Sequence, residues 1–573
     1  MLKKTKLNYF VFNTLFVIIS SIIAGLKFYP IYLAKENIII NFAVHPFDIC
    51  AEYPDVWLKI KIIYIVFFIS SSFIISNTIY SSIFNIKNNS NNKVISNNYS
   101  DLHLKIFDSN FKDPIILPKQ GLYQNILITG TIGSGKTSCA MYPFTKQLIK
   151  YKYNDSSKKL GMLILDVKGN YYSQVKKYAK YYKREDDLIV IGLDENIKYN
   201  PLDKPNLKPT ILANRLKTIL TLFSKNNSES YWLDKAEQIL AECIKLCRLY
   251  NNGYVTFSEI HKLVTVPNYY SEKLHDLRNK FLSGKLSKQE VYDLLSAIEF
   301  FEKEFINLDS RTASILKSEI TRITGCFISD FDVLNTFSPE KVDLNFFGFE
   351  DVVNSGKIVV LKMNIAEYRN LSKIIAAYLK LDFQTEVMAR LAHANSEIRD
   401  VAFISDEYHE YVTETDADFF AQSREAKCIN IVATQSYTSL LNAINNQYSV
   451  KVIVQNLINK FWFRTDDIFT IEDIQKQVGK EDKKKISKSF SESRNKAKFN
   501  FITKNFNSND ASVSESINSF TQYDFVYDTQ FFTQKLPTFS CLAFLSTGTS
   551  ILTPKKLTLT PYFILDKDME NKI

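Results

Sequence analysis

Two long uncharged stretches open the chain and predict helices that span a membrane. Residues 7–26 and 62–86 contain no charged side chain, and Phe, Leu, Ile and Val dominate both stretches. Each stretch is long enough to cross a hydrocarbon layer of about 30 Å as a helix. The first is longer than the apolar core of a signal peptide and a second follows it, so we expect two retained spans, at about 7–26 and 62–84. The alternative is one span followed by a buried helix of a soluble domain.

Beyond residue 100, short apolar runs alternate with helical patterns, which predicts an α/β fold. Apolar runs that are typical of buried strands lie at 125–129, 163–165, 357–361, 401–404, 429–433 and 538–546. Between residues 204 and 345 such runs are scarce, and apolar residues recur at helical spacing instead. Helices are expected there at 232–250, 289–305 and 311–325. We therefore expect a sheet flanked by helices, interrupted by an all-α insertion.

Three polar segments separate or follow these elements. Residues 85–98 contain seven Asn among fourteen residues, which predicts a flexible linker. Residues 480–488 hold five Lys and two acidic residues. We expect a solvated loop there, and the alternative is a tract that follows the phosphates of a nucleic acid. Residues 490–522 are rich in Ser and Asn and are expected to form a mobile surface excursion.

Composition narrows the class of protein. The chain has 573 residues, of which 46% are hydrophobic and 23% charged, so a large core is available and wholesale disorder is excluded. Lys and Arg (71) exceed Asp and Glu (61) by 10. This excess suits nucleic acid or an anionic membrane surface but demonstrates neither. The seven Cys form no C-x-x-C pair, which argues against a disulfide framework and against a typical zinc site.

The strongest chemical signal is a phosphate-binding loop. Residues 130–137 read G-T-I-G-S-G-K-T, between a predicted strand and a predicted helix. Glycines let backbone N–H groups turn toward phosphate oxygens, and the helix N-terminus adds positive charge. Lys136 is expected to reach the β- and γ-phosphates of ATP, and the Thr137 hydroxyl to bind Mg²⁺. The predicted ATP contacts are Gly130, Thr131, Ile132, Gly133, Ser134, Gly135, Lys136, Thr137 and Ser138.

An acidic pair supplies the partner that such a loop needs. Asp406 and Glu407 follow the apolar run 401–404. Asp406 is expected to bind Mg²⁺ together with Thr137, and Glu407 to orient and activate the attacking water. The alternative is an ordinary strand end that carries two carboxylates.

Two further residues are candidates for catalysis. Gln435 follows the apolar run 429–433, so it is expected at the carboxyl edge of the sheet as a sensor of the γ-phosphate. Arg424 lies between the two strands and is a candidate arginine finger that acts across a subunit boundary. The alternative for Arg424 is a surface ion pair with Glu425 or another neighbour.

The order of these elements resembles the type IV secretion coupling proteins, the TraG/TraD-like ATPases of conjugation. The resemblance covers most of the chain. It rests on the two N-terminal spans, the P-loop, Asp166-Val-Lys168-Gly169, Asn200-Pro-Leu-Asp203, Tyr231-Trp232 with Ala236, Asp406-Glu407, Ser423-Arg-Glu425, Ala433-Thr-Gln-Ser436, and Asn456 with Arg464 to Asp466. One departure is Tyr408, where the family usually has Phe. For Asp166 and Lys168 two interpretations stay open, a strand-end carboxylate near the nucleotide and a buried ion pair.

The resemblance implies a RecA-like P-loop ATPase that assembles as a membrane-bound homohexamer. Such proteins couple ATP hydrolysis to the passage of relaxase-bound single-stranded DNA, or of protein effectors, into a type IV secretion channel. The chain then divides into a membrane anchor (1–88), a first part of the RecA-like domain (89–203), an all-α insertion (204–345) and a second part (346–573). Because ATP is cytoplasmic, the expected location is the inner membrane, crossed twice, with the ATPase body in the cytoplasm.

Two other functions are compatible with the same residues. One is a nucleotide-dependent substrate receptor or adaptor that does not pump, for which the large helical insertion is the support. The other is a translocase of double-stranded DNA of the FtsK/HerA kind. Against the latter, the C-terminal part shows no recognisable winged-helix reader.

Overall fold

The computed structural model describes residues 102–166, 168–223, 230–393, 398–444, 446–493, 498–500, 505–507 and 512–570. The chain divides into two compact units, Met1–Ser100 and Asp101–Ile573, and only the second is described below. The predicted membrane spans and the linker 85–98 lie outside the described residues. Among the helices that are described, none is both long enough and apolar enough to cross a bilayer.

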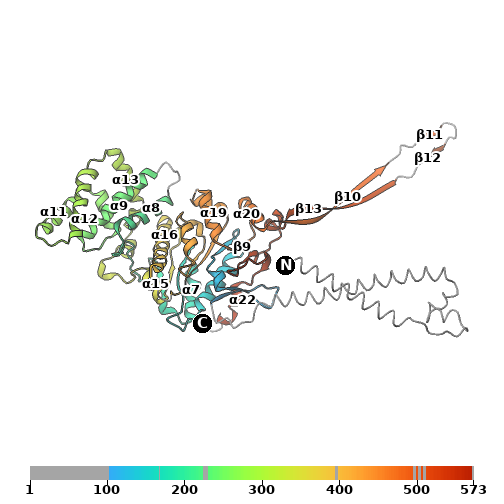
Figure 1. Cartoon of the computed structure of the whole chain (residues 1–573), viewed down its shortest axis with the longest axis horizontal. Coiled ribbons are helices and arrows are strands. Elements are labelled where there is room, and N and C mark those ends of the chain that lie inside the picture. The colour runs from blue at the N-terminus through green and yellow to red at the C-terminus, as the bar shows by residue number, and fades with distance from the viewer. Residues whose placement is uncertain are drawn as a thin grey trace. The chain divides into compact units, whose positions relative to one another are not determined.

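Nine strands of the described chain form one mixed sheet (Figure 1). Their order is β15-β14-β9-β3-β8-β7-β4-β6-β5. The strands are β3 (Ile126–Thr129), β4 (Gly161–Leu165), β5 (Leu188–Ile191), β6 (Ile358–Leu361), β7 (Val401–Ser405), β8 (Cys428–Thr434), β9 (Asn459–Phe463), β14 (Ser540–Phe544) and β15 (Lys555–Thr558). All neighbours from β9 to β5 are parallel, whereas β14 runs antiparallel to both β9 and β15. The apolar run 538–546 corresponds to β14. This strand is not the last of the sheet, because β15 follows it in the chain.

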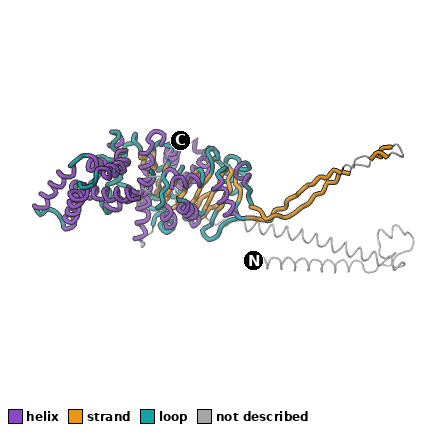
Figure 2. The backbone as a smooth tube through the Cα atoms, turned by 90° about the horizontal axis from the view of Figure 1, so that it is seen from above, coloured by secondary structure: helices purple, strands orange, loops and turns teal. Residues whose placement is uncertain are grey.

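Side chains point alternately to opposite faces along the central strands, and they build two apolar cores, one on each face of the sheet. In β3, Ile126 and Ile128 belong to one apolar cluster and Leu127 to the other, as expected when successive side chains point to opposite faces. The first cluster is covered by α6 (Tyr142–Lys150) and α7 (Tyr171–Tyr181), and the second by α16 (Ile365–Ala389). Figure 2 shows helices on both sides of the strands. The chain therefore has an α/β fold with a large mixed sheet flanked by helices.

The described residues between β5 and β6 form helices and no strand of the sheet. The helices are α8 (Pro209–Thr221), α9 (Ser230–Tyr250), α10 (Phe257–Thr265), α11 (Tyr269–Leu282), α12 (Lys288–Glu299), α13 (Ser310–Thr324), α14 (Phe331–Phe337) and α15 (Phe349–Ser355). The predicted helices correspond to α9, to α12 with the π-helical turn Phe300–Phe305, and to α13. Cys243 and Cys247, one helical turn apart on α9, are both buried.

Shorter elements complete the unit. They are β1 (His103–Ile106), β2 (Ile115–Pro118), α5 (Lys119–Leu122), α17 (Asp416–Gln422), α18 (Tyr437–Ile444), α19 (Gln447–Asn456), α20 (Ile468–Val478), β11 (Lys498–Asn500), β12 (Asn505–Asn507), α21 (Thr529–Thr533), α22 (Tyr562–Leu565) and α23 (Lys567–Glu570).

The Lys-rich segment after α20 is a strand, so the expectation of a loop is wrong. Strand β10 (Lys480–Ser493) pairs antiparallel with β13 (Ser512–Phe525) over fourteen residues. The Ser- and Asn-rich segment therefore supplies the second strand of a long two-stranded ribbon, at least where it is described. Composition misled the prediction because Lys and Ser disfavour strands only weakly, and a cross-strand partner overrides that preference.

Candidate functional site

The predicted site residues come from three neighbouring strands that end at the same edge of the sheet. The P-loop follows β3, the acidic pair follows β7, and Gln435 follows β8. Strand β8 lies between β3 and β7 and is parallel to both. Because the three carboxyl ends are adjacent, segments about 300 residues apart in the chain meet there.

The P-loop has a backbone that only glycine adopts readily. Gly133 has φ of 75° and Gly135 has φ of 100°, both in the left-handed region. A Cβ atom on Gly135 would lie 2.5 Å from the ring of Phe539, so a side chain is also excluded by contact. The following helix begins at Thr137 with a π-helical turn, Thr137–Met141, and continues as α6. Its N-terminal N–H groups face the loop, which is the arrangement that binds anions.

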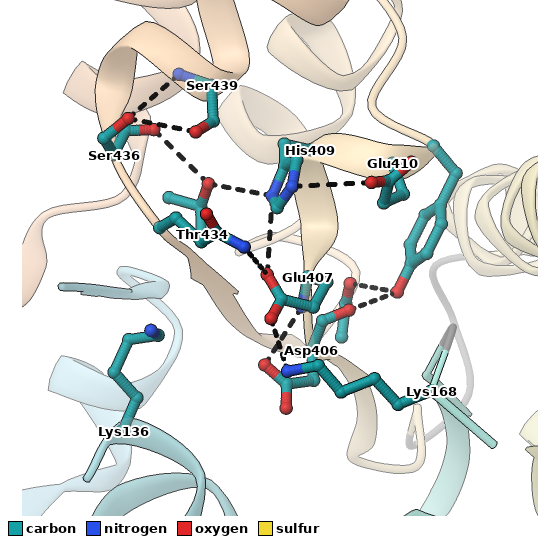
Figure 3. Close-up of polar contacts among 12 residues, drawn as sticks. Lys136, Lys168, Asp406, Glu407, His409, Glu410, Thr434, Ser436 and Ser439 are labelled. Carbon is teal, nitrogen blue, oxygen red and sulfur yellow. Dashed lines mark hydrogen bonds and ion pairs between the residues drawn. The ribbon is translucent and has the colours of Figure 1, made fainter. Parts of the chain in front are cut away.

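Lys136 is folded back onto this loop. Its ammonium donates hydrogen bonds to the carbonyl oxygens of Gly130, at 2.5 Å, and of Thr131, at 3.2 Å. Burial lowers the pKa of Lys136, and the charges of Glu407 and Asp406 oppose that effect. Figure 3 shows Lys136 on one side of the site and the acidic pair on the other. A bound phosphate between them would give Lys136 a better partner than two neutral carbonyls.

Asp406 is buried and faces the P-loop. The Thr137 hydroxyl donates to its Oδ2 at 2.9 Å. Burial, reinforced by the nearby carboxylate of Asp166, raises the pKa of Asp406 to about 6. A cation beside Asp406 would stabilise the ionised form of this buried carboxylate. Within the described chain there is no group of three or more His, Cys, Asp or Glu placed to hold a metal ion. Mg²⁺ fits nonetheless, because it is commonly bound by one or two protein oxygens together with phosphate oxygens and water.

Glu407 is held by three polar neighbours (Figure 3). Lys168 Nζ lies 2.5 Å from its Oε1, while Gln435 Nε2 and His409 Nδ1 lie 3.4 and 3.7 Å from its Oε2. Burial would raise the pKa of Glu407, but the hydrogen bond and charge of Lys168 hold it below its usual value. Glu407 also has a left-handed backbone, with φ of 47° and ψ of 44°. Its carboxylate is therefore ionised and fixed in position, able to accept a proton from water.

Lys168 was not assigned a role from the sequence, and in the structure its ammonium pairs with a residue other than Asp166. The Asp166 carboxylate accepts backbone N–H groups of Lys168, Asn170 and Tyr171 at the start of α7. The Lys168 ammonium reaches across to Glu407 instead. Lys168 therefore forms an ion pair, but with Glu407 and not with Asp166, and Asp166 is a strand-end carboxylate close to the site. The available signal was the D-x-K-G spacing, which does not say where the lysine points.

His409 is the second residue whose place the sequence did not indicate. Its Nδ1 lies 3.3 Å from the Thr434 hydroxyl, at the end of β8. Its Nε2 lies 3.7 Å from Glu410, which pairs with Lys373. Burial lowers the pKa of His409. A neutral imidazole thus separates Glu407 from Glu410.

Two other predicted site residues are exposed and do not face the acidic pair. Arg424 is exposed in the turn between α17 and β8, at the amino end of that strand. Seven residues of β8 separate it from the site, a distance of about 20 Å. Arg424 therefore cannot serve the P-loop of its own subunit. Ile132 is also exposed, at 77%, on the outside of the loop.

A cavity of about 540 Å³ borders the outer side of the P-loop. It lies where β8 and β9 end, and its lining includes Thr131, Ile132, Gln435, Arg464 and Asp466. It adjoins the place where phosphates would sit without enclosing Lys136 or Asp406. This volume lies within the range of small-molecule sites.

A buried ion pair stabilises the turn that carries Asp406 and Glu407. Lys380 on α16 and Asp416 at the start of α17 are both fully buried, 2.6 Å apart. The Tyr408 hydroxyl donates to the same carboxylate, and Tyr408 directly follows Glu407. The pair thereby fixes the turn that carries Glu407.

We expect Lys380→Met to destabilise the protein by about 3–5 kcal/mol, because it leaves the Asp416 charge buried without its partner. The thermal unfolding midpoint of the full chain measures the loss. The matched control is Lys373→Met on the same helix, whose pair with Glu410 is partly exposed and is expected to contribute at most about 1 kcal/mol. Equal midpoints for the two variants would contradict the prediction.

We expect Lys168→Met to lower ATP turnover roughly tenfold with little change in ATP affinity, because Glu407 loses the contact that orients its carboxylate. Steady-state hydrolysis and equilibrium binding of a nucleotide analogue separate the two quantities. Lys177→Met, an exposed position on α7, is the control. A fall in affinity without a fall in turnover would show that Lys168 acts on the nucleotide instead.

A known protein family matches part of this chain. Residues 114–298 match the family described as the type IV secretion-system coupling protein DNA-binding domain. The resemblance to the type IV secretion coupling proteins is confirmed. No curated protein matches this sequence.

Solved structures of the plasmid coupling protein TrwB share the fold. The complex with a non-hydrolysable ATP analogue has a TM-score of 0.51 at 14% identity, covering 80% of this chain and 90% of that chain. The complex with ADP and Mg²⁺ has a TM-score of 0.51 at 12% identity, covering 80% and 89%. The unbound form lacking the N-terminal segment has a TM-score of 0.50 at 12% identity, covering 80% and 88%. At such identities the comparison establishes a coupling-protein fold and nothing further.

Proposed function

We propose that this chain is a membrane-anchored ATPase that couples DNA to a type IV secretion channel and drives its transfer by ATP hydrolysis. One observation carries the proposal: the P-loop, Asp406, Glu407 and Gln435 converge at one edge of the sheet. Two comparisons support it. Residues 114–298 match the DNA-binding domain of coupling proteins, and TrwB, which has the same fold, was solved with nucleotides.

We assign each residue a task in this reaction. The loop N–H groups and Lys136 bind the phosphates, and Thr137 and Asp406 are placed to hold Mg²⁺, which would neutralise triphosphate charge. Glu407 accepts a proton from the attacking water, while Lys168 keeps its carboxylate ionised and oriented. Gln435 donates a hydrogen bond to Glu407 and would contact the γ-phosphate. Arg424, at the opposite edge, would act only on the site of a neighbouring subunit.

The assembly and its partners belong to the same proposal. The cargo is single-stranded DNA with a bound relaxase, or a protein effector, and the partners are components of the channel. A homohexamer in the cytoplasmic membrane, anchored through residues 1–88, would place an ATP site beside each subunit boundary. The RecA-like segments 89–203 and 346–573 would form the motor, and the helical segment 204–345 would contact cargo.

The test is ATP turnover of the full chain in detergent, with and without single-stranded DNA. We expect DNA to raise turnover, since a motor hydrolyses ATP productively only when it is loaded. Stimulation by double-stranded DNA alone would favour the translocase of the FtsK/HerA kind. Nucleotide binding with negligible turnover in every condition would favour the receptor that does not pump.

A further inference from the structure

Two phenylalanines lie beside the P-loop and have no part in the phosphate chemistry described above. The backbone N–H of Phe539 donates to the carbonyl oxygen of Ser134 at 3.0 Å, and its ring packs against Gly135. Phe563, on α22, lies next to it, with 6.2 Å between the ring centroids and 69° between the ring planes. Phe563 is 46% exposed, and Phe539 is partly buried. An aromatic surface that is open to solvent therefore adjoins the loop that would bind phosphate.

The order of the strands places this surface on the side of the P-loop away from the acidic pair. Phe539 directly precedes β14, which runs antiparallel to β9, so Phe539 lies at the edge of the sheet from which the P-loop emerges. Strand β14 lies to one side of β3, and β7, which carries Asp406 and Glu407, lies to the other. The P-loop thus has carboxylates on one flank and aromatic rings on the opposite flank.

The direction of a bound triphosphate follows from the same arrangement. Its γ-phosphate must face Glu407, because that carboxylate is placed to accept the proton of the attacking water. The loop N–H groups and the helix N-terminus hold the α- and β-phosphates, so the sugar and base leave near the first turn, Thr137–Met141. Helix α22 packs against that turn, and the rings of Tyr142 and Tyr562 meet edge to face at 5.1 Å. The base would therefore emerge on the side where α22 lies.

The surface is held in place by buried polar contacts. Asp566, just after α22, is buried. It accepts a hydrogen bond from the Tyr178 hydroxyl of α7 at 3.0 Å and forms an ion pair with Lys146 of α6. The segment that carries Phe563 is thus attached to both helices that cover this face of the sheet. A surface fixed before the ligand arrives loses little conformational freedom on binding.

We propose that the base of the bound nucleotide stacks on the aromatic surface formed by Phe539 and Phe563. The inference rests on the ATPase proposed above and names the part of the site that holds the base. A base has two flat π-faces, and an open aromatic ring next to the phosphates is the partner that such a face takes. Stacking of this kind is present in the bound ground state and in the transition state alike. It therefore contributes to affinity and not to the chemical step.

The test measures equilibrium binding of two ligands by the full chain in detergent, a non-hydrolysable ATP analogue and tripolyphosphate, each with Mg²⁺. Phe563→Ala is expected to weaken binding of the analogue about tenfold and to leave binding of tripolyphosphate unchanged, since only the analogue has a base. Ile564→Ala, at the adjacent position with 48% exposure, is the matched control and is expected to change neither. Phe563→Trp is expected to keep the parent affinity. Its added fluorescence should be quenched by the analogue and not by tripolyphosphate.

Steady-state turnover provides a second measurement on the same variants. In Phe563→Ala, KM for ATP is expected to rise by about the same factor while kcat stays at the parent value, because uniform binding is lost. A fall in kcat at unchanged KM would show that Phe563 acts on the reacting groups, and would contradict the proposal.

Three binding results would also overturn it. One is unchanged affinity for the analogue in Phe563→Ala. Another is an equal loss for the analogue and for tripolyphosphate, which would make Phe563 a support of the loop only. A third is a loss selective for the analogue in Ile132→Ala but not in Phe563→Ala, which would place the base in the cavity beside Gln435. Failure of the proposed function is recognised separately, because the parent chain would then bind neither ligand.

Discussion

Replacing Glu407 by glutamine is expected to lower ATP turnover about 10²- to 10⁴-fold while nucleotide affinity is retained. Glutamine keeps the size of the side chain and its hydrogen bond to Gln435, but it cannot accept a proton from water. Lys168 then loses its anionic partner, which does not restore a base to the site. Steady-state phosphate release and equilibrium binding of a fluorescent ATP analogue measure the two quantities on the same preparation.

The matched control for this variant is Glu410→Gln. Glu410 lies three residues further along, on the far side of His409, and pairs with the partly exposed Lys373. Its loss is expected to change turnover less than about threefold, because a partly exposed ion pair contributes little. If Glu410→Gln and Glu407→Gln reduced turnover equally, His409 would have to be reconsidered as a relay between the two carboxylates.

Replacing Lys136 by alanine is expected to reduce turnover at least about 100-fold and to weaken ATP binding as well. Lys136 is nearly buried, and its ammonium is held within the P-loop itself. Lys150→Ala, at the exposed end of α6, is expected to leave both quantities unchanged. Membrane insertion of Lys136→Ala should equal that of the parent, since the substitution lies far along the chain from residues 1–88.

Hydrolysis at the parent rate by Lys136→Ala would remove the P-loop from the reaction. A variant that binds ATP normally yet does not hydrolyse it would limit Lys136 to the chemical step. Both results come from the assays of ATP turnover and ATP binding. The thermal unfolding midpoint of the variant shows separately whether it is folded.

Local pattern was enough to predict the strands and the loop at the centre of the fold. The apolar runs at 125–129, 357–361 and 401–404 match β3, β6 and β7 to within one residue. Strands buried on both faces of a parallel sheet need continuous apolar side chains, so they are visible in sequence. The P-loop was equally visible, because its two left-handed glycines and its lysine must lie at fixed spacing.

Polar segments were predicted less well for a physical reason. The Lys-rich stretch that begins at residue 480 carries no continuous apolar run, since one face of the ribbon is polar and the other mixes lysine with apolar groups. Its strand conformation depends on pairing with a segment that begins about 30 residues later. Nothing within the stretch itself records that partner.

The sequence by itself determined which groups are available at this site: a glycine-rich loop with a lysine, a threonine hydroxyl and two adjacent carboxylates. Only the tertiary structure decided which groups meet. It inserted β8 between β3 and β7, turned Lys168 away from Asp166 toward Glu407, and left Arg424 at the opposite edge. Residue type sets what a side chain can do, whereas strand order sets its neighbours, and strand order arises from packing between segments hundreds of residues apart.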